Sequence, residues 1–162
     1  MRDTTTGPIL AVEDNPDDIF LLETAFAKAE LKGEVQFVRD GIAATEYLDG
    51  VGPYADRERF KRPSLVLLDL KLPRKSGMEV LAWMRDKPEG ERVPVIVFTA
   101  SNKEEDVRKA YELGAFSYHV KSIGFNELFA LIRNIDLCRT SLVECVLDPV
   151  PSLPGARRPG NG

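Results

Sequence analysis

The chain has 162 residues, of which 43% are apolar and 30% charged, a composition typical of one soluble globular domain with a buried core. Its formal net charge of −4 argues against direct binding to nucleic acid, and no stretch approaches the roughly 18 apolar residues that span a bilayer. Residues 1–8 are polar, with no apolar run behind a basic end. We therefore expect an N-terminal arm rather than a signal peptide, on a cytoplasmic protein.

Short apolar runs alternate along the chain with longer amphipathic stretches. The runs predict buried strands at residues 9–12, 35–38, 65–68, 93–98 and 115–120. The amphipathic stretches predict helices at residues 16–30, 41–48, 78–87, 103–113 and 124–139. Five strands that alternate with five helices indicate right-handed βαβ units and a doubly wound α/β fold with a parallel sheet.

Local signals mark the ends of several elements. Asn15 followed by Pro16 is typical of a helix N-terminus, with the asparagine as cap and the proline in the first turn. Glycines, prolines and charges fill residues 49–62, which predicts a long loop. We expect one domain over residues 9–147 and, because residues 148–162 are rich in proline and glycine, a disordered tail after it.

The two cysteines, Cys138 and Cys145, lie seven positions apart. On a helix they would be about 10 Å apart along the axis, too far for a disulfide, which needs Cα atoms within about 7 Å. We expect two reduced thiols that pack as small apolar side chains in a reducing cytoplasm.

Polar side chains follow four of the five predicted strands. Glu13 and Asp14 come after the first strand, Asp69 after the third, Thr99 at the end of the fourth and Lys121 after the fifth. The carboxyl ends of parallel strands share one edge of the sheet, where ligands of open α/β folds bind. Three carboxylates in one cleft repel each other, and a hard divalent cation such as Mg²⁺ relieves that repulsion.

These residue types together indicate phosphoryl transfer. Asp69 is placed to attack a phosphoryl donor and form an aspartyl phosphate, while Lys121 and Mg²⁺ stabilise the charge on the phosphoryl oxygens. The Thr99 hydroxyl and the backbone N–H groups of Leu70 and Ala100 are candidate hydrogen-bond donors to those oxygens. Each residue alone has an ordinary structural explanation, as a loop acid, a helix cap or a solvated lysine. No such explanation accounts for the whole set at the ends of four predicted strands.

Gly77 follows the turn-rich segment Pro73-Arg74-Lys75-Ser76, close after Asp69 in the chain. A glycine at this point predicts a loop that needs an unusual backbone angle beside the site.

The sequence resembles the receiver domain of response regulators over about residues 9–139. The matching pieces are Val12-Glu13-Asp14-Asn15, Leu67-Leu68-Asp69-Leu70-Lys71-Leu72-Pro73 with Gly77, Val95-Ile96-Val97-Phe98-Thr99-Ala100-Ser101, and Lys121. The resemblance implies a flavodoxin-like (βα)5 fold with strand order 2-1-3-4-5. It also implies a signalling protein that accepts a phosphoryl group from a sensor histidine kinase, and not an enzyme that turns over a substrate.

The resemblance also implies a role for each matched residue. Asp69 corresponds to the phosphoacceptor, and Asp14 and Asp69 to direct Mg²⁺ ligands. Further correspondences are the Lys71 carbonyl as a metal ligand, Glu13 as an acid that reaches the metal through water, Thr99 as the switch hydroxyl, Lys121 as the lysine that pairs with the phosphate, and Tyr118 as the aromatic that swings inward.

A narrower resemblance is to the small response regulators that pair with bacterial phytochromes. The extended loop from Gly52 to Pro63 and the Leu-Pro-Arg-Lys-Ser-Gly segment point to this group. In most receivers a proline follows the lysine, often in a cis peptide, but here Ser122 follows Lys121. A cis bond without proline costs about 2.5–4 kcal/mol, so we expect the following loop to differ in shape.

The predicted output is through contacts rather than through an output domain, since the segment after Leu147 is short. We expect signalling to an unknown downstream protein through the face of the fourth helix, fifth strand and fifth helix. A homodimer across that face is also expected, because this region holds more apolar residues than one core stripe needs. These residues are Phe116, Phe125, Leu128, Phe129 and Ile132.

Two other classes share parts of this pattern. A phosphatase of the haloacid dehalogenase type also uses a strand-end aspartate with Mg²⁺, but it needs a second aspartate two positions later, where this chain has Lys71. A pseudo-receiver is an interaction module that takes no phosphoryl group, and the intact set of site residues argues against it. His119, the only histidine, is interpreted as structural rather than as a phosphotransfer group.

Overall fold

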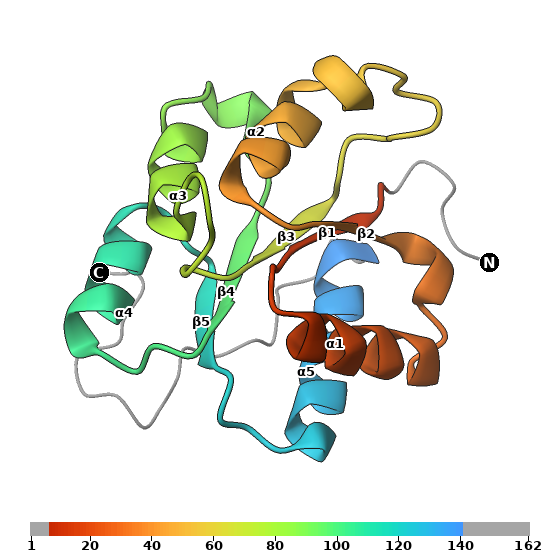
Figure 1. Cartoon of the computed structure of the whole chain (residues 1–162), viewed down its shortest axis with the longest axis vertical. Coiled ribbons are helices and arrows are strands. Elements are labelled where there is room, and N and C mark those ends of the chain that lie inside the picture. Colours follow the sequence, from red (N-terminus) through yellow and green to blue (C-terminus); the bar gives the residue numbers. More distant parts are fainter. Residues whose placement is uncertain (1–6, 141–162) are drawn as a thin grey trace.

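The computed structural model describes residues 7–140, which form a five-stranded parallel sheet with helices on both faces (Figure 1). The strand order is β2-β1-β3-β4-β5, which confirms the predicted topology. The strands are β1 (Ile9–Val12), β2 (Val35–Val38), β3 (Leu65–Leu68), β4 (Val95–Thr99) and β5 (Ser117–Val120). No helix in this part of the chain is long and apolar enough to cross a membrane.

The helices divide into two layers. They are α1 (Pro16–Lys28), α2 (Gly41–Asp49), α3 (Gly77–Arg85), α4 (Glu104–Glu112) and α5 (Phe125–Thr140). Helices α1 and α5 cover one face of the sheet, and α2, α3 and α4 cover the other (Figure 1). Because alternate strand residues point to opposite faces, Leu10 packs in the α2–α4 layer and Ile9 in the α1–α5 layer. Strands covered on both faces explain the unbroken apolar runs.

Two strands begin later than the sequence predicts. Pro94 has no N–H to donate, and the β4 ladder starts after it, at Val95 rather than at residue 93. The N–H of Ala115 donates to the carbonyl of Ala110 at 3.0 Å, and this bond closes the end of α4 instead of joining the sheet. Strand β5 therefore starts at Ser117 rather than at residue 115.

Helix α1 ends at Lys28, two residues before the predicted end. Glu30 has a φ of 63°, a left-handed angle that ends the helix. The predicted loop over residues 49–62 contains a short 3₁₀ turn, Gly52–Tyr54, and its aromatic side chains pack together. The ring centroid of Tyr54 lies 5.1 Å from that of Tyr47 and 5.2 Å from that of Phe60.

Several sequence predictions lie outside the described residues. They concern most of the N-terminal arm, the end of the domain at residue 147, the tail at 148–162, Cys145 and the side chain of Cys138.

Candidate functional site

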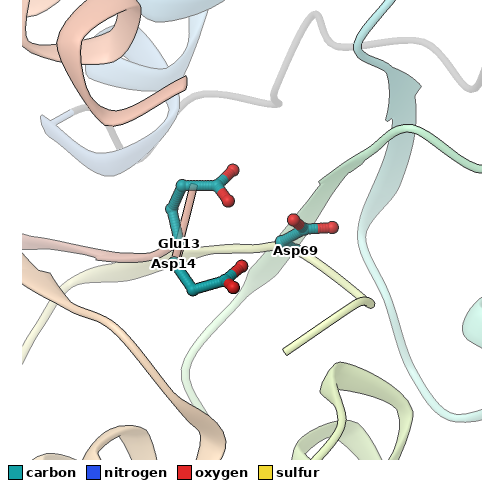
Figure 2. Close-up of side chains that lie close together, drawn as sticks. All are labelled: Glu13, Asp14 and Asp69. Carbon is teal, nitrogen blue, oxygen red and sulfur yellow. The ribbon is translucent and has the colours of Figure 1, made fainter. Parts of the chain in front are cut away.

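Three acidic side chains meet at the carboxyl ends of β1 and β3, and we call Glu13, Asp14 and Asp69 the carboxylate cluster (Figure 2). One ligand oxygen from each lies within 4.8 Å of the others. Register brings them together, because Val12 pairs with Leu68 across the parallel strands and the Asp69 N–H donates to the Val12 carbonyl at 3.1 Å. The predicted meeting of these residues at one sheet edge is therefore observed.

The turn after β1 is held by the cap of α1. The Asn15 side chain accepts hydrogen bonds from the N–H groups of Asp17 at 2.9 Å and Asp18 at 3.2 Å, as predicted for an N-cap. The Asn15 N–H in turn donates to Glu13 Oε2 at 3.2 Å. This cap fixes both the carboxylate of Glu13 and the direction in which α1 leaves the site.

Lys121 lies over the carboxylate cluster and binds three acids. Its Nζ lies 2.6 Å from Glu13 Oε1, 2.7 Å from Asp18 Oδ2 and 2.9 Å from Asp69 Oδ2. The Lys121 side chain is only 12% exposed. Burial alone would lower the lysine pKa, but the hydrogen bonds to Asp18, Asp69 and Glu13 outweigh it and raise the pKa. The ammonium is therefore charged at every physiological pH.

Glu13 is the most buried carboxyl of the cluster. Burial raises its pKa to about 7, and the neighbouring charge of Asp69 adds to that effect, while the hydrogen bond from Lys121 opposes it. Among the residues that the structure describes, Lys121 is the cation paired with the carboxylate cluster, and one positive charge leaves three carboxylates with excess negative charge. Such a site favours a divalent cation.

The Thr99 side chain is fully buried at the end of β4, and its Oγ1 has no hydrogen-bond partner in the described part of the chain. A buried hydroxyl without a partner costs free energy. The Lys121 N–H donates to the Thr99 carbonyl at 2.8 Å, so the backbone holds the two residues side by side. The hydroxyl is thus kept beside the site with its hydrogen-bonding capacity unused.

Tyr118 is fully buried and points into the α2–α4 layer. Its hydroxyl donates to the carbonyl of Ser101 at 2.8 Å, and burial raises its pKa to about 12. Ser101 in turn donates from Oγ to Asp106 at 2.5 Å. In this structure, which holds no phosphoryl group, Tyr118 is thus already buried, and its hydrogen bond connects β5 to the loop before α4.

The loop after β3 approaches Asp69 closely. The Lys71 N–H donates to Asp69 Oδ1 at 3.3 Å. The predicted unusual backbone angle in this loop falls on Arg74, with a φ of 68°, and not on Gly77. Gly77 is needed for space instead, because a Cβ atom there would lie 2.1 Å from the Asp69 carbonyl oxygen.

Two further expectations concern β5 and the loop after it. The bond between Lys121 and Ser122 is trans, like the other peptide bonds of the described chain, so the loop forms without a cis peptide. A ring nitrogen of His119 lies 3.1 Å from Ser117 Oγ, and burial lowers the histidine pKa to about 4. A neutral, partly buried imidazole bound to a serine agrees with a structural role.

The sequence analysis did not assign Asp18 to the site. Asp18 lies in the first turn of α1, where an acidic residue ordinarily serves only to stabilise the helix N-terminus. Its side chain instead reaches Lys121, which is 103 positions away in the sequence. No local pattern could have identified this contact, because it depends on how α1 packs beside the β5–α5 loop.

The donor set of the carboxylate cluster fits a hard divalent cation. All three residues offer carboxylate oxygens, which Mg²⁺ and Mn²⁺ prefer, and no sulfur or imidazole ligand lies among them. The carboxyl edge of the sheet thus brings together three carboxylates, a lysine and a buried hydroxyl without a partner.

A family model described as the response regulator receiver domain matches residues 9–133. The chain belongs to this family, the phosphorylation-controlled receivers of two-component signal transduction.

Among known proteins, the chain is similar to response regulators of phytochromes. Response regulator Rcp1 of Synechocystis sp. is 39% identical over 138 residues, which cover 84% of this chain and 92% of Rcp1. The crystal structure of the Mn(2+)-bound form of Rcp1 superimposes with a TM-score of 0.71 at 37% identity, covering 87% of this chain and 99% of that one. The crystal structure of the phosphorylated cyanobacterial phytochrome response regulator RcpA superimposes with a TM-score of 0.74 at 38% identity, covering 88% of this chain and 99% of RcpA. The structure of the bacteriophytochrome response regulator RtBRR superimposes with a TM-score of 0.69 at 39% identity, covering 90% of this chain and 85% of RtBRR.

Proposed function

We propose that Asp69 accepts a phosphoryl group from a sensor histidine kinase while Mg²⁺ is held at the carboxylate cluster. The observation that carries the proposal is the position of Asp69. Its buried carboxylate lies in the cluster and receives a hydrogen bond from Lys121 at 2.9 Å. A nucleophile, a cation and a set of metal-ligating oxygens are therefore within contact distance of one another.

In the proposed reaction, an Asp69 carboxylate oxygen forms a bond to phosphorus, and the bond from phosphorus to the donor histidine nitrogen breaks. The electron pair of that bond leaves with the nitrogen. Lys121 donates to a phosphoryl oxygen, and the backbone N–H groups of Leu70 and Ala100 are further donors. When bound, Mg²⁺ shields the negative charge on the phosphoryl and carboxylate oxygens.

The roles of the metal ligands follow from the same proposal. Asp14 and Asp69 are the direct ligands, the Lys71 carbonyl is another, and Glu13 acts through water. The Lys71 backbone lies beside Asp69, since the Lys71 N–H donates to Asp69 Oδ1 at 3.3 Å.

Thr99 and Tyr118 are proposed to transmit the change. The unpartnered Thr99 hydroxyl turns to a phosphoryl oxygen once one is present, which removes the cost of the unsatisfied donor. That movement changes the packing beside the loop before α4, which Tyr118 holds through its bond to Ser101.

The partner is proposed to be a bacterial phytochrome with histidine kinase activity. The names of RcpA and RtBRR support this assignment, since both are described as phytochrome or bacteriophytochrome response regulators. The protein is further proposed to act as a phosphoacceptor that takes one phosphoryl group per chain, and not as a phosphatase that turns over a substrate.

Acetyl phosphate and Mg²⁺ test the proposed chemistry. We expect the intact mass of the wild type to rise by one phosphoryl group, and the mass of Asp69→Asn to stay unchanged because the amide is not a nucleophile. A variant such as Asp86→Asn, on the surface after α3, makes the same chemical change elsewhere and should still be modified. A folded wild type that gains no mass would contradict the proposal and favour the pseudo-receiver.

Dimerisation through α4, β5 and α5 is proposed as the readout. Phe116, Phe125 and Phe129 keep part of their rings accessible, whereas Leu128 and Ile132 belong to the core. We expect the solution mass, measured by light scattering with Mg²⁺ and beryllofluoride, to be that of a dimer, and Phe129→Ala to reduce it. A monomer at high concentration in both states would contradict this readout.

A further inference from the structure

Lys121 has no free hydrogen-bond donor in this structure. An ammonium group has three N–H bonds. Three carboxylate oxygens, from Glu13, Asp18 and Asp69, lie 2.6 to 2.9 Å from Nζ. A phosphoryl oxygen can therefore bind Lys121 only if one of these acids gives up its contact.

Asp18 differs from the other two acids in its position. It comes from the first turn of α1, which packs beside α5 (Figure 1), and its oxygens are not part of the carboxylate cluster. Its side chain is 27% exposed, against 2% for Glu13 and 6% for Asp69. Of the two acids that keep a free carboxylate when Asp69 is phosphorylated, Asp18 is therefore the one whose release to water leaves no charge buried.

We propose that Asp18 is a competing counterion, which occupies one donor of Lys121 in the unphosphorylated protein and is displaced by the phosphoryl oxygen. The inference rests on the proposed phosphorylation of Asp69. Displacing Asp18 exchanges one charge-assisted hydrogen bond for another and returns a carboxylate to solvent. Displacing Glu13 would instead remove the ammonium partner from a carboxylate that is only 2% exposed, which costs more.

Two consequences separate competition from a purely structural role. As a competitor, Asp18 lowers the affinity of the site for a phosphoryl group, both by occupying Lys121 and by placing a negative charge beside an incoming anion. If Asp18 had only a structural role, connecting α1 to the β5–α5 loop, it would hold Lys121 in place. Its loss would then weaken binding of the phosphoryl group. The sign of the change in affinity therefore decides between the two roles.

The test is a beryllofluoride titration at saturating Mg²⁺, followed through the bound fluoride resonances. We expect Asp18→Asn to bind beryllofluoride at least about threefold more tightly than wild type, the scale expected for loss of a partly exposed ion pair. Asp17→Asn is the matched control, because it removes the same charge from the next residue, whose side chain is exposed. Asp18→Glu should return the affinity toward that of the wild type.

Affinity for Mg²⁺ without beryllofluoride and the unfolding temperature of each variant are measured in parallel. These measurements show whether a change in beryllofluoride affinity comes from anion binding itself or from altered metal binding or stability. An Asp18→Asn variant that binds beryllofluoride as Asp17→Asn does, or more weakly, would overturn the inference and leave the proposed function intact. A folded wild type that binds Mg²⁺ but no beryllofluoride would overturn the proposed function and this inference together.

Discussion

Replacing Lys121 with methionine should lower the free energy of unfolding by about 2–3 kcal/mol in buffer without divalent ions. The substitution keeps most of the side-chain volume but removes the cation that contacts Glu13, Asp18 and Asp69. Their mutual repulsion is then unopposed in a site that is largely closed to water. The change is measured by urea unfolding at pH 7.5 with a chelator present.

Added Mg²⁺ should restore much of the stability lost in Lys121→Met, and it should stabilise this variant more than it stabilises the wild type. The reason is that Lys121 and the metal neutralise the same carboxylates, so removing one strengthens binding of the other. Lys87→Met is the control, because Lys87 pairs with Asp49 at 2.7 Å on the surface and its loss should cost less than about 1 kcal/mol. Equal responses to Mg²⁺ in all three proteins would contradict a metal site that shares its carboxylates with Lys121.

His119 should make the protein less stable as the pH falls from about 6.5 to about 4. The unfolded histidine takes up a proton near pH 6.5, whereas burial lowers the pKa of the folded histidine to about 4. Between these values the unfolded chain binds more protons, so protonation favours unfolding as the pH falls. The full effect of this one residue is about 3 kcal/mol at the lower end of the window.

Glu13 acts in the opposite direction over an overlapping range. Its folded pKa is raised from 4.5 to about 7, so the folded protein binds the additional proton there and gains stability as the pH falls. The contribution of His119 is therefore read from the difference between wild type and His119→Gln. Urea unfolding from pH 7 to pH 4.5 should show a steeper loss of unfolding free energy in the wild type than in His119→Gln, because the contribution of Glu13 is common to both. Parallel curves of unfolding free energy against pH for the two proteins would contradict the low pKa of His119.

Most of the strands and helices, and the strand ends that carry the site residues, follow from local features of the sequence. The apolar runs at residues 9–12 and 65–68 are strands that are buried on both faces. Every residue of such a strand must be apolar, so the strand can be recognised from consecutive residues. The cap at Asn15 is equally local, since it uses N–H groups two and three positions away. Once the alternation of strands and helices implied a parallel sheet, the carboxyl ends of its strands had to share an edge.

The tertiary structure decided the contacts between those elements. It placed Asp18 against Lys121, left the Thr99 hydroxyl without a partner and brought Gly77 against the backbone of Asp69. Periodicity, caps and turns act between near neighbours and can be read along the chain. Which donor meets which acceptor across more than a hundred positions is set by how the helices pack on the sheet.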